Sequence, residues 1–248
     1  MKDLGITHLH LLPVYDINSV NERVTEGQYN WGYDPKNYNL PEGMYSTNPY
    51  DGNVRINEFK QLIQALHDRG ISVIMGVVYN HTYVTEQSAF TYTVPGYYYR
   101  MSSSTFYING TGCGNTLASD KAMFNSYMLN SLRYWVEEYH IDGFRFDLAA
   151  AHDIYTMNEI RAMFNKMYDG EGKKIIMYGE PWTGTGGWTG LDAANSATIS
   201  NASKFSENIG SFNDATRNAI QDWFKGGINQ TNTVKQGITS TTKPGLKP

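Results

Sequence analysis

Two charged residues interrupt the otherwise apolar stretch HIDGFRFDLAAAHDI, which spans His140–Ile154. Arg145 and Asp147 stand two residues apart, and alternate side chains of a β-strand point to the same face. We therefore expect both charges on one face of a strand, where they form either a structural ion pair or part of a site. The opposite face would carry Phe144, Phe146 and Leu148.

Glu180 supplies a second carboxyl group. It follows Asp147 in the chain by one strand–helix–strand unit, which predicts that the two residues lie on neighbouring strands. Two carboxyl groups facing each other across a pocket perform glycoside hydrolysis: one attacks or stabilises the anomeric carbon, and the other protonates the leaving oxygen. The Arg145 guanidinium would orient Asp147 and keep it ionised, whereas a carboxyl group beside another carboxylate is shifted toward its protonated form. The alternative for Glu180 is a surface carboxylate in a loop.

Four further polar or aromatic residues could complete a sugar site. Asn80 and His81 end the apolar stretch ISVIMGVVY, and His81 could donate to a sugar hydroxyl or serve a structural role. The segment WGYDP predicts a turn in which Trp31 and Tyr33 are free to stack on a sugar, or in which they simply pack.

The order of elements that would position these residues alternates strand and helix. Parallel strands covered by helices read as continuous apolar runs, and helices as apolar residues at helical spacing. The candidate groups fall at the C-terminal ends of three predicted strands, where parallel α/β folds build their active sites. The predicted strands are Ile6–Val14, Ile71–Tyr79, the segments IDGFRFDLA and KIIMYGEPW and, more weakly, KFSENIG; the predicted helices are Asn57–Arg69, a helix over Met123–Tyr139, and Ile154 to Met167.

The composition excludes several classes of function. The chain of 248 residues has a net charge of -4, which gives no basis for binding nucleic acid or an anionic membrane. A single cysteine, Cys113, excludes an internal disulfide, and no Cys/His cluster has zinc spacing. Aromatic residues make up 14% and many lie in polar, Gly-rich segments, which suits a neutral sugar ligand. Neither a protein partner nor a compartment can be inferred.

With these residues in view, the sequence resembles the alpha-amylase clan of glycoside hydrolases, and within it the type I pullulanases. Four motifs in order carry the resemblance, and GCGNTLAS and FNDATRNAI add to it. The motifs are YNWGYDP (Tyr29–Pro35), GVVYNHT (Gly76–Thr82), DGFRFDLA (Asp142–Ala149) and YGEPW (Tyr178–Trp182).

The resemblance implies retaining hydrolysis of α-1,6 branch linkages in pullulan, glycogen or branched starch, with a branched α-glucan as substrate. It implies Asp147 as the nucleophile, Glu180 as the acid/base and Arg145 as its positioning partner. A retaining mechanism implies about 5 to 5.5 Å between the two carboxyl groups. The substrate-binding residues it implies are Tyr33, His81, Asn80 and Trp182.

Two departures from the family pattern set further expectations. Gly76 stands at a position where the clan usually has Asp. The family also has an Asp after a His at the end of the seventh barrel strand, and this sequence has no such pair there. His152 and Asp153 have the same residue order as that pair, but they come at the start of a predicted helix, which Asp153 can cap. We therefore expect an α/β fold that is a partial TIM (β/α)8 barrel, approximately strands 2 to 6, and a chain that is weakly active or inactive alone. Residues 1–248 would form this incomplete barrel, with a loop insertion at 82–116 after the third barrel strand and a polar tail at 226–248.

Several alternatives stay open at this point. Another clan enzyme, such as isoamylase, a branching enzyme or an α-amylase, is one, although YNWGYDP argues against a plain amylase. A non-catalytic glucan-binding protein is a second alternative, but such a protein would be expected to lack the two carboxylates that this sequence retains. A phosphate-binding barrel is a third, and it is disfavoured because no Gly-rich phosphate loop is present. No cofactor is expected, and calcium is left open because Asn80 and nearby Asp residues offer oxygen ligands without a legible ligand pattern.

Overall fold

The computed structural model describes residues 1–24, 27–218 and 221. The chain divides into a compact unit, Met1–Gly210, and a second unit, Ser211–Pro248. The predicted polar tail, 226–248, lies outside the described residues. Among the described residues, no helix has the length and apolar character needed to cross a membrane.

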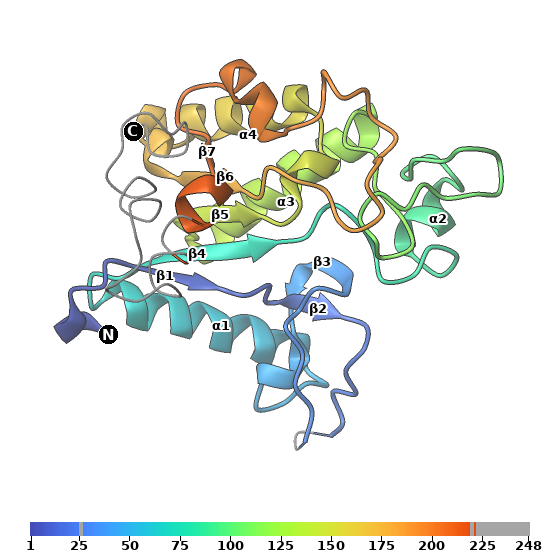
Figure 1. Ribbon diagram of the computed structural model, residues 1–248. Coiled ribbons are helices and arrows are strands. Elements are labelled where there is room, and N and C mark those ends of the chain that lie inside the picture. The colour runs from blue at the N-terminus through green and yellow to red at the C-terminus, as the bar shows by residue number, and fades with distance from the viewer. Residues whose placement is uncertain (25–26, 219–220, 222–248) are drawn as a thin grey trace. The chain divides into compact units, whose positions relative to one another are not determined.

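A parallel sheet forms the centre of the first unit (Figure 1). The strand order is β1-β4-β5-β6-β7, and the pairs β1 with β4, β4 with β5, and β5 with β6 are parallel. The predicted alternation of strand and helix is thereby confirmed, although every strand is shorter than its apolar run. The strands are β1 (His8–Leu11), β4 (Ser72–Val77), β5 (Gly143–Phe146), β6 (Ile176–Gly179) and the two-residue β7 (Gly210–Ser211).

Three long helices connect these strands: α1 (Gly52–His67), α3 (Ala122–Tyr139) and α4 (Ile154–Lys166). Helix α1 begins earlier than its apolar periodicity predicts, because the Asp51 side chain accepts a hydrogen bond from the backbone N–H of Asn53 and caps it. The predicted stop at Gly70 is confirmed, since this residue has φ 64° just beyond the helix. His140, with φ 57°, ends α3 in the same left-handed conformation.

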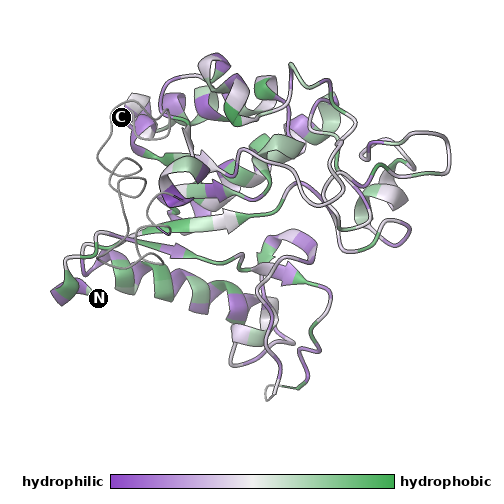
Figure 2. Ribbon diagram, in the orientation of Figure 1, coloured by the Kyte–Doolittle hydropathy of each residue, from purple (hydrophilic) through white to green (hydrophobic). Residues whose placement is uncertain are grey.

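The two faces of the sheet differ in character. Met75, Phe144 and Met177 are register partners on the face that packs against the helices, where the Phe144 ring stacks on Phe164 of α4 at 5.5 Å. In Figure 2, β4 is largely apolar, whereas α1 alternates between apolar and polar turns. Arg145 and its partner Tyr178 lie on the opposite face, so the predicted alternation within the β5 strand is confirmed.

Several shorter elements were not predicted. Strands β2 (Tyr15–Ile17) and β3 (Pro35–Pro41) form a separate two-stranded antiparallel sheet. The segment 82–116 follows β4 as expected, but it contains a short helix, α2 (Ala89–Thr93), capped by Ser88. The 3-10 turns are η1 (Lys2–Leu4), η2 (Gly43–Tyr45), η3 (Ala149–Ala151), η4 (Met167–Lys174) and η5 (Ile199–Lys204).

The weak prediction of a strand over KFSENIG was wrong for all of the segment except Gly210. Lys204 ends η5, and the Asn158 side chain of α4 bonds both the Lys204 carbonyl and the Ser206 N–H. Asn208 has φ 67°, which an extended strand does not accommodate. These backbone groups are therefore committed to a helix side chain instead of a strand ladder.

Candidate active site

The ends of β5 and β6 bring the two predicted carboxyl groups together. Asp147 directly follows β5, and its N–H donates to the Val77 carbonyl of β4 at 2.9 Å. Glu180 directly follows β6, and its N–H donates to the Phe146 carbonyl of β5 at 3.0 Å. The prediction that these two residues come from neighbouring strands is confirmed, because parallel pairing fixes their register.

A single guanidinium holds both carboxyl groups. Arg145 Nη1 lies 2.8 Å from Asp147 Oδ1, and Arg145 Nη2 forms an ion pair with Glu180 Oε1. All three side chains are largely withdrawn from solvent, with 10%, 13% and 17% of the Arg145, Asp147 and Glu180 side chains exposed. The contact with Asp147 was expected, whereas the contact with Glu180 was not.

The environment of Glu180 favours its protonated form. Burial raises the pKa of Glu180 above its ordinary value, and the nearby charge of Asp147 raises it further. The Leu148 N–H and the Arg145 charge oppose this shift without cancelling it. Such a carboxyl group retains a proton at a higher pH than a surface glutamate, as a general acid requires.

Leu148 is a site residue that the sequence did not reveal. Its backbone has φ 42° and ψ 53°, and its N–H donates to Glu180 Oε2 at 3.1 Å. A leucine in the left-handed region is strained, and such residues concentrate at functional sites. The alternation of side chains expected for the strand therefore ends at Phe146. Because leucine is an ordinary apolar strand residue, its type gives no indication of this turn.

Asn80 and His81 connect the Asp147 carboxylate to the WGYDP turn. Asn80 Nδ2 donates to the Asp147 carbonyl at 2.9 Å and to Asp147 Oδ2 at 3.0 Å. His81 Nδ1 lies 2.5 Å from Asn80 Oδ1, and His81 Nε2 lies 3.0 Å from the Tyr33 carbonyl oxygen. A sugar hydroxyl that bonds His81 must therefore replace one of these protein oxygens. Burial lowers the pKa of His81, while the charge of Asp147 opposes that shift.

Tyr33 and Trp182 are the two aromatic residues of the predicted sugar site. The Tyr33 side chain is half-buried; burial raises the pKa of its hydroxyl, and the charges of Arg145, Asp147 and Glu180 also act on it. Trp182 is half-buried two residues beyond Glu180. Sugar contacts by both residues remain predictions.

On the Arg145 face of the sheet, His10 was missed, and Tyr178 was predicted only as part of the YGEPW motif. The Tyr178 hydroxyl and His10 Nδ1 lie 3.1 Å apart, and burial together with the Arg145 charge lowers the pKa of His10. The alternation in HLHL could have indicated His10, because it places a polar side chain on one face of an apolar strand.

Gly76 lies in the same row of the sheet as Arg145, its register partner. A Cβ at this position would lie 3.1 Å from the Leu11 carbonyl oxygen and 3.3 Å from Pro13 Cδ. The position where the family pattern has Asp is therefore closely surrounded in this chain.

The His152–Asp153 pair takes no part in the carboxyl cluster. Asp153 caps α4 by accepting from the Thr156 N–H at 2.8 Å, as predicted. His152 is fully buried, and neither ring nitrogen has a hydrogen-bond partner among the described residues. Burial and the Arg100 charge lower the pKa of His152 to about 3.

One other cluster of three acidic residues lies near Arg55. Asp16, Glu22 and Glu42 place oxygen atoms within 4.8 Å of one another. Arg55 already pairs with this cluster, 2.9 Å from Glu22 and 3.8 Å from Asp16. Because the arginine supplies the positive charge there, the cluster gives no support to a bound cation.

Comparison with known proteins agrees with this geometry. Residues 1–116 match the family model of the alpha-amylase catalytic domain. The crystal structure of pullulanase from Paenibacillus barengoltzii in complex with maltohexaose and alpha-cyclodextrin superposes with a TM-score of 0.83 at 48% identity, covering 88% of this chain and 33% of that one. The chain belongs to the alpha-amylase family, and its parallel sheet is part of the family's catalytic (β/α)8 domain.

Among individual proteins, the chain is similar to pullulanases. It is 41% identical to the pullulanase of Bacillus subtilis (strain 168) over 221 residues, which is 89% of this chain and 30% of that protein. It is 35% identical to the chloroplastic pullulanase 1 of Arabidopsis thaliana, covering 88% of this chain and 26% of that protein. The chain thus spans less than a third of the length of these two relatives.

Proposed function

We propose that this chain supplies the catalytic carboxyl pair of a retaining glycoside hydrolase that cleaves α-1,6 branch linkages in pullulan, glycogen or branched starch. The observation that carries the proposal is the Arg145 guanidinium, which holds Asp147 and Glu180 together at the ends of neighbouring parallel strands. This is the edge at which a parallel α/β domain binds its substrate.

The surroundings of each carboxyl group support a different role. Arg145 and Asn80 donate to the Asp147 carboxylate, and such donors stabilise the anion that attacks the anomeric carbon. Burial raises the pKa of Glu180, so this residue would protonate the leaving oxygen and then accept a proton from water. Asp147 is the proposed nucleophile and Glu180 the proposed acid/base.

The close approach of the two carboxyl groups supports retention of configuration. Asp147 and Glu180 both form ion pairs with the single guanidinium of Arg145. Inverting enzymes need about 6.5 to 9.5 Å between their carboxyl groups to admit a water molecule, whereas retaining enzymes need about 5 to 5.5 Å. Two carboxyl groups that share one guanidinium fit the shorter separation.

The α-1,6 specificity rests on similarity to the pullulanases, one of which was crystallised with maltohexaose and alpha-cyclodextrin. Tyr33, His81, Asn80 and Trp182 would contact the sugar at the cleavage site. A family member that cleaves α-1,4 bonds would share the carboxyl pair, and a non-catalytic glucan-binding protein would share only the sugar contacts. The products released from pullulan separate these three functions.

The test measures maltotriose released from pullulan by the chain alone and by a chimera in which it replaces the matching segment of the Bacillus subtilis pullulanase. Asp147→Asn and Glu180→Gln versions serve as controls. We expect maltotriose from the chimera and none from either control. A folded chimera that releases other products, or whose activity survives both substitutions, would contradict the proposal.

A further inference from the structure

A cavity lies away from the carboxyl cluster, between β3 and the segment that follows β4. It has a volume of about 420 Å³ and is lined by residues from 18, 35–37 and 82–92. We call it the β3 pocket. Its volume falls within the range of about 300 to 1,000 Å³ that small-molecule sites occupy. Asp147, Glu180 and Arg145 are not among its lining residues.

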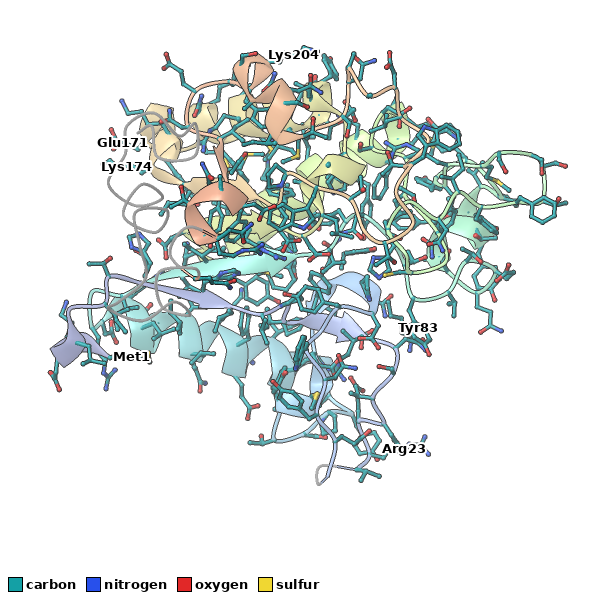
Figure 3. All side chains as sticks on the ribbon, viewed as in Figure 1. Met1, Arg23, Tyr83, Glu171, Lys174 and Lys204 are labelled. Atoms are coloured by element: carbon teal, nitrogen blue, oxygen red, sulfur yellow. The ribbon has the colours of Figure 1, made fainter. Side chains whose placement is uncertain are left out.

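Two tyrosine rings border the β3 pocket without belonging to the core. Tyr92 of α2 is 74% exposed and Tyr83 is 45% exposed. Figure 3 labels Tyr83 beside the β2–β3 sheet, where its side chain projects outward. Exposed rings at a cavity rim can stack on the apolar faces of a ligand, because an aromatic ring offers a large rigid surface with little loss of side-chain entropy.

Side-chain amides supply the polar part of the pocket. Asn18 and Gln87 line it, and their amides make no hydrogen bond to the described part of the chain. Asn37 uses Nδ2 to donate to Asp16 Oδ2 at 2.5 Å, which leaves its oxygen available. Each amide offers both donors and an acceptor, which matches the hydroxyl groups of a sugar.

The charge of the pocket favours a neutral ligand. Lys36 is the only charged residue among those that line it, and no carboxylate faces it. A cation would meet only this like charge, and an anion would have a single charged partner among otherwise neutral lining residues.

The two walls of the pocket are fixed by hydrogen bonds. The Tyr83 N–H donates to the Pro35 carbonyl at 3.0 Å, and the buried Tyr38 hydroxyl donates to the His81 carbonyl at 2.6 Å. Strand β3 is thereby tied to the segment that carries Tyr83, and the cavity is formed before any ligand arrives. Pre-formed walls lower the entropic cost of binding.

We propose that the β3 pocket binds a stretch of neutral glucan chain, in addition to the segment held at the carboxyl pair. Tyr83 and Tyr92 stack on sugar rings, and Asn18, Asn37 and Gln87 bond the hydroxyl groups. The choice of an α-linked glucan rests on the proposed function, whereas the choice of a neutral sugar rests on the pocket itself.

The test uses the full chain carrying Asp147→Asn and Glu180→Gln, so that hydrolysis is blocked, and maltotetraose as the probe. Backbone amide shifts are followed by heteronuclear NMR during titration. We expect saturable shifts at Tyr83, Gln87 and Tyr92, and a loss of affinity of about fivefold or more in the Tyr92→Ala variant. Tyr50→Ala is the matched control, because Tyr50 is also 74% exposed but does not line this pocket.

Shifts confined to the surroundings of Asn80 and Trp182, or an equal loss of affinity in the Tyr92→Ala and Tyr50→Ala variants, would overturn the inference. Cellotetraose serves as a second probe, and binding as tight as that of maltotetraose would overturn the choice of an α-glucan. Maltotetraose binding at the β3 pocket without pullulan hydrolysis by the chimera would refute the proposed function alone. Hydrolysis without shifts at Tyr83, Gln87 and Tyr92 would refute the pocket alone.

Discussion

Two clusters in this molecule each combine one arginine with carboxyl groups, but their partners differ. Arg145 holds Asp147 and Glu180, which end two neighbouring parallel strands. Arg55 of α1 holds Glu22 through both terminal nitrogens and also lies near Asp16. The residue types are nearly the same in the two clusters, so composition alone does not distinguish a candidate active site from a structural cluster.

The difference lies in what else the carboxyl groups bond. Glu42, beside Arg55, accepts from the Ile17 and Met44 N–H groups, each at 2.8 Å, and Glu22 accepts from the Gly43 N–H. These bonds hold the β2–β3 region to α1. Glu180 instead accepts one backbone N–H, from the strained Leu148, and faces Asp147. Carboxyl oxygens committed to local backbone stabilise a fold, whereas those held mainly by side chains across strand ends remain able to react.

The largest expected effect is the difference in kcat between removing a carboxylate from the Arg145 cluster and removing one from the Arg55 cluster. In the chimera with the Bacillus subtilis pullulanase, we expect Asp147→Asn and Glu180→Gln each to lower kcat for pullulan by about a thousandfold or more. Glu42→Gln should leave kcat within about twofold, because its partners are backbone groups of η2 and β2. Steady-state kinetics measure both, and a comparable loss of kcat in the Glu42→Gln variant would remove the distinction between the clusters.

The second effect concerns the two arginines. Arg55→Gln should lower the free energy of unfolding by about 3 to 5 kcal/mol, because it leaves buried carboxylates without their cation. Arg145→Gln should cost less stability, since Asp147 and Glu180 can share a proton once the guanidinium is gone. Urea unfolding monitored by circular dichroism provides the comparison. Equal losses would show that both arginines serve only the fold.

A smaller effect involves His152, a buried group with no hydrogen-bond partner, which faces Arg100 and Asp153. Its pKa of about 3 in the folded chain lies below the ordinary 6.5. The unfolded chain therefore binds a proton first, and stability present above pH 6.5 is lost as the pH falls toward 3, by at most about 1.4 kcal/mol per unit. Unfolding curves at pH 7, 6 and 5 should show this slope in the unmodified chain.

The His152→Leu variant should reduce that slope between pH 6.5 and 5, because the titrating group is gone. His8→Leu, an exposed position, is the control and should leave the slope unchanged. An unaltered slope in the His152→Leu variant would assign the acid sensitivity to the carboxyl clusters instead.

The smallest expected effect concerns Leu148. Leu148→Gly should change the free energy of unfolding by no more than about 1 kcal/mol, because relief of the left-handed strain offsets the greater backbone entropy of glycine. The Leu148 N–H remains, so the pKa of Glu180, followed by NMR of labelled carboxyl carbons, should be unchanged. His140→Gly, at the left-handed end of α3, is the control for glycine at such a position. A large shift in the Glu180 pKa would mean that the leucine side chain itself positions the acid.

Much of the fold could be predicted from local patterns. The strand and helix order followed from apolar runs and helical spacing, and the position of Asp147 and Glu180 on neighbouring strands followed from their place after two such runs. The β2–β3 sheet was not predicted, because its short strands carry mixed polar residues and pair with a register shift. The KFSENIG strand was predicted wrongly because the bonds from Asn158 depend on α4, which is distant in sequence.

The sequence by itself determined which residues are candidates for the chemistry and on which face of a strand they lie, because side-chain alternation and strand ends are local properties. Only the tertiary structure decided that Arg145 holds both carboxyl groups, that Leu148 turns its N–H toward Glu180, and that His81 contacts the Tyr33 carbonyl. Each of these contacts joins different strands or reverses the local backbone preference. Such contacts depend on the packing of the whole sheet, which residue types and spacing do not specify.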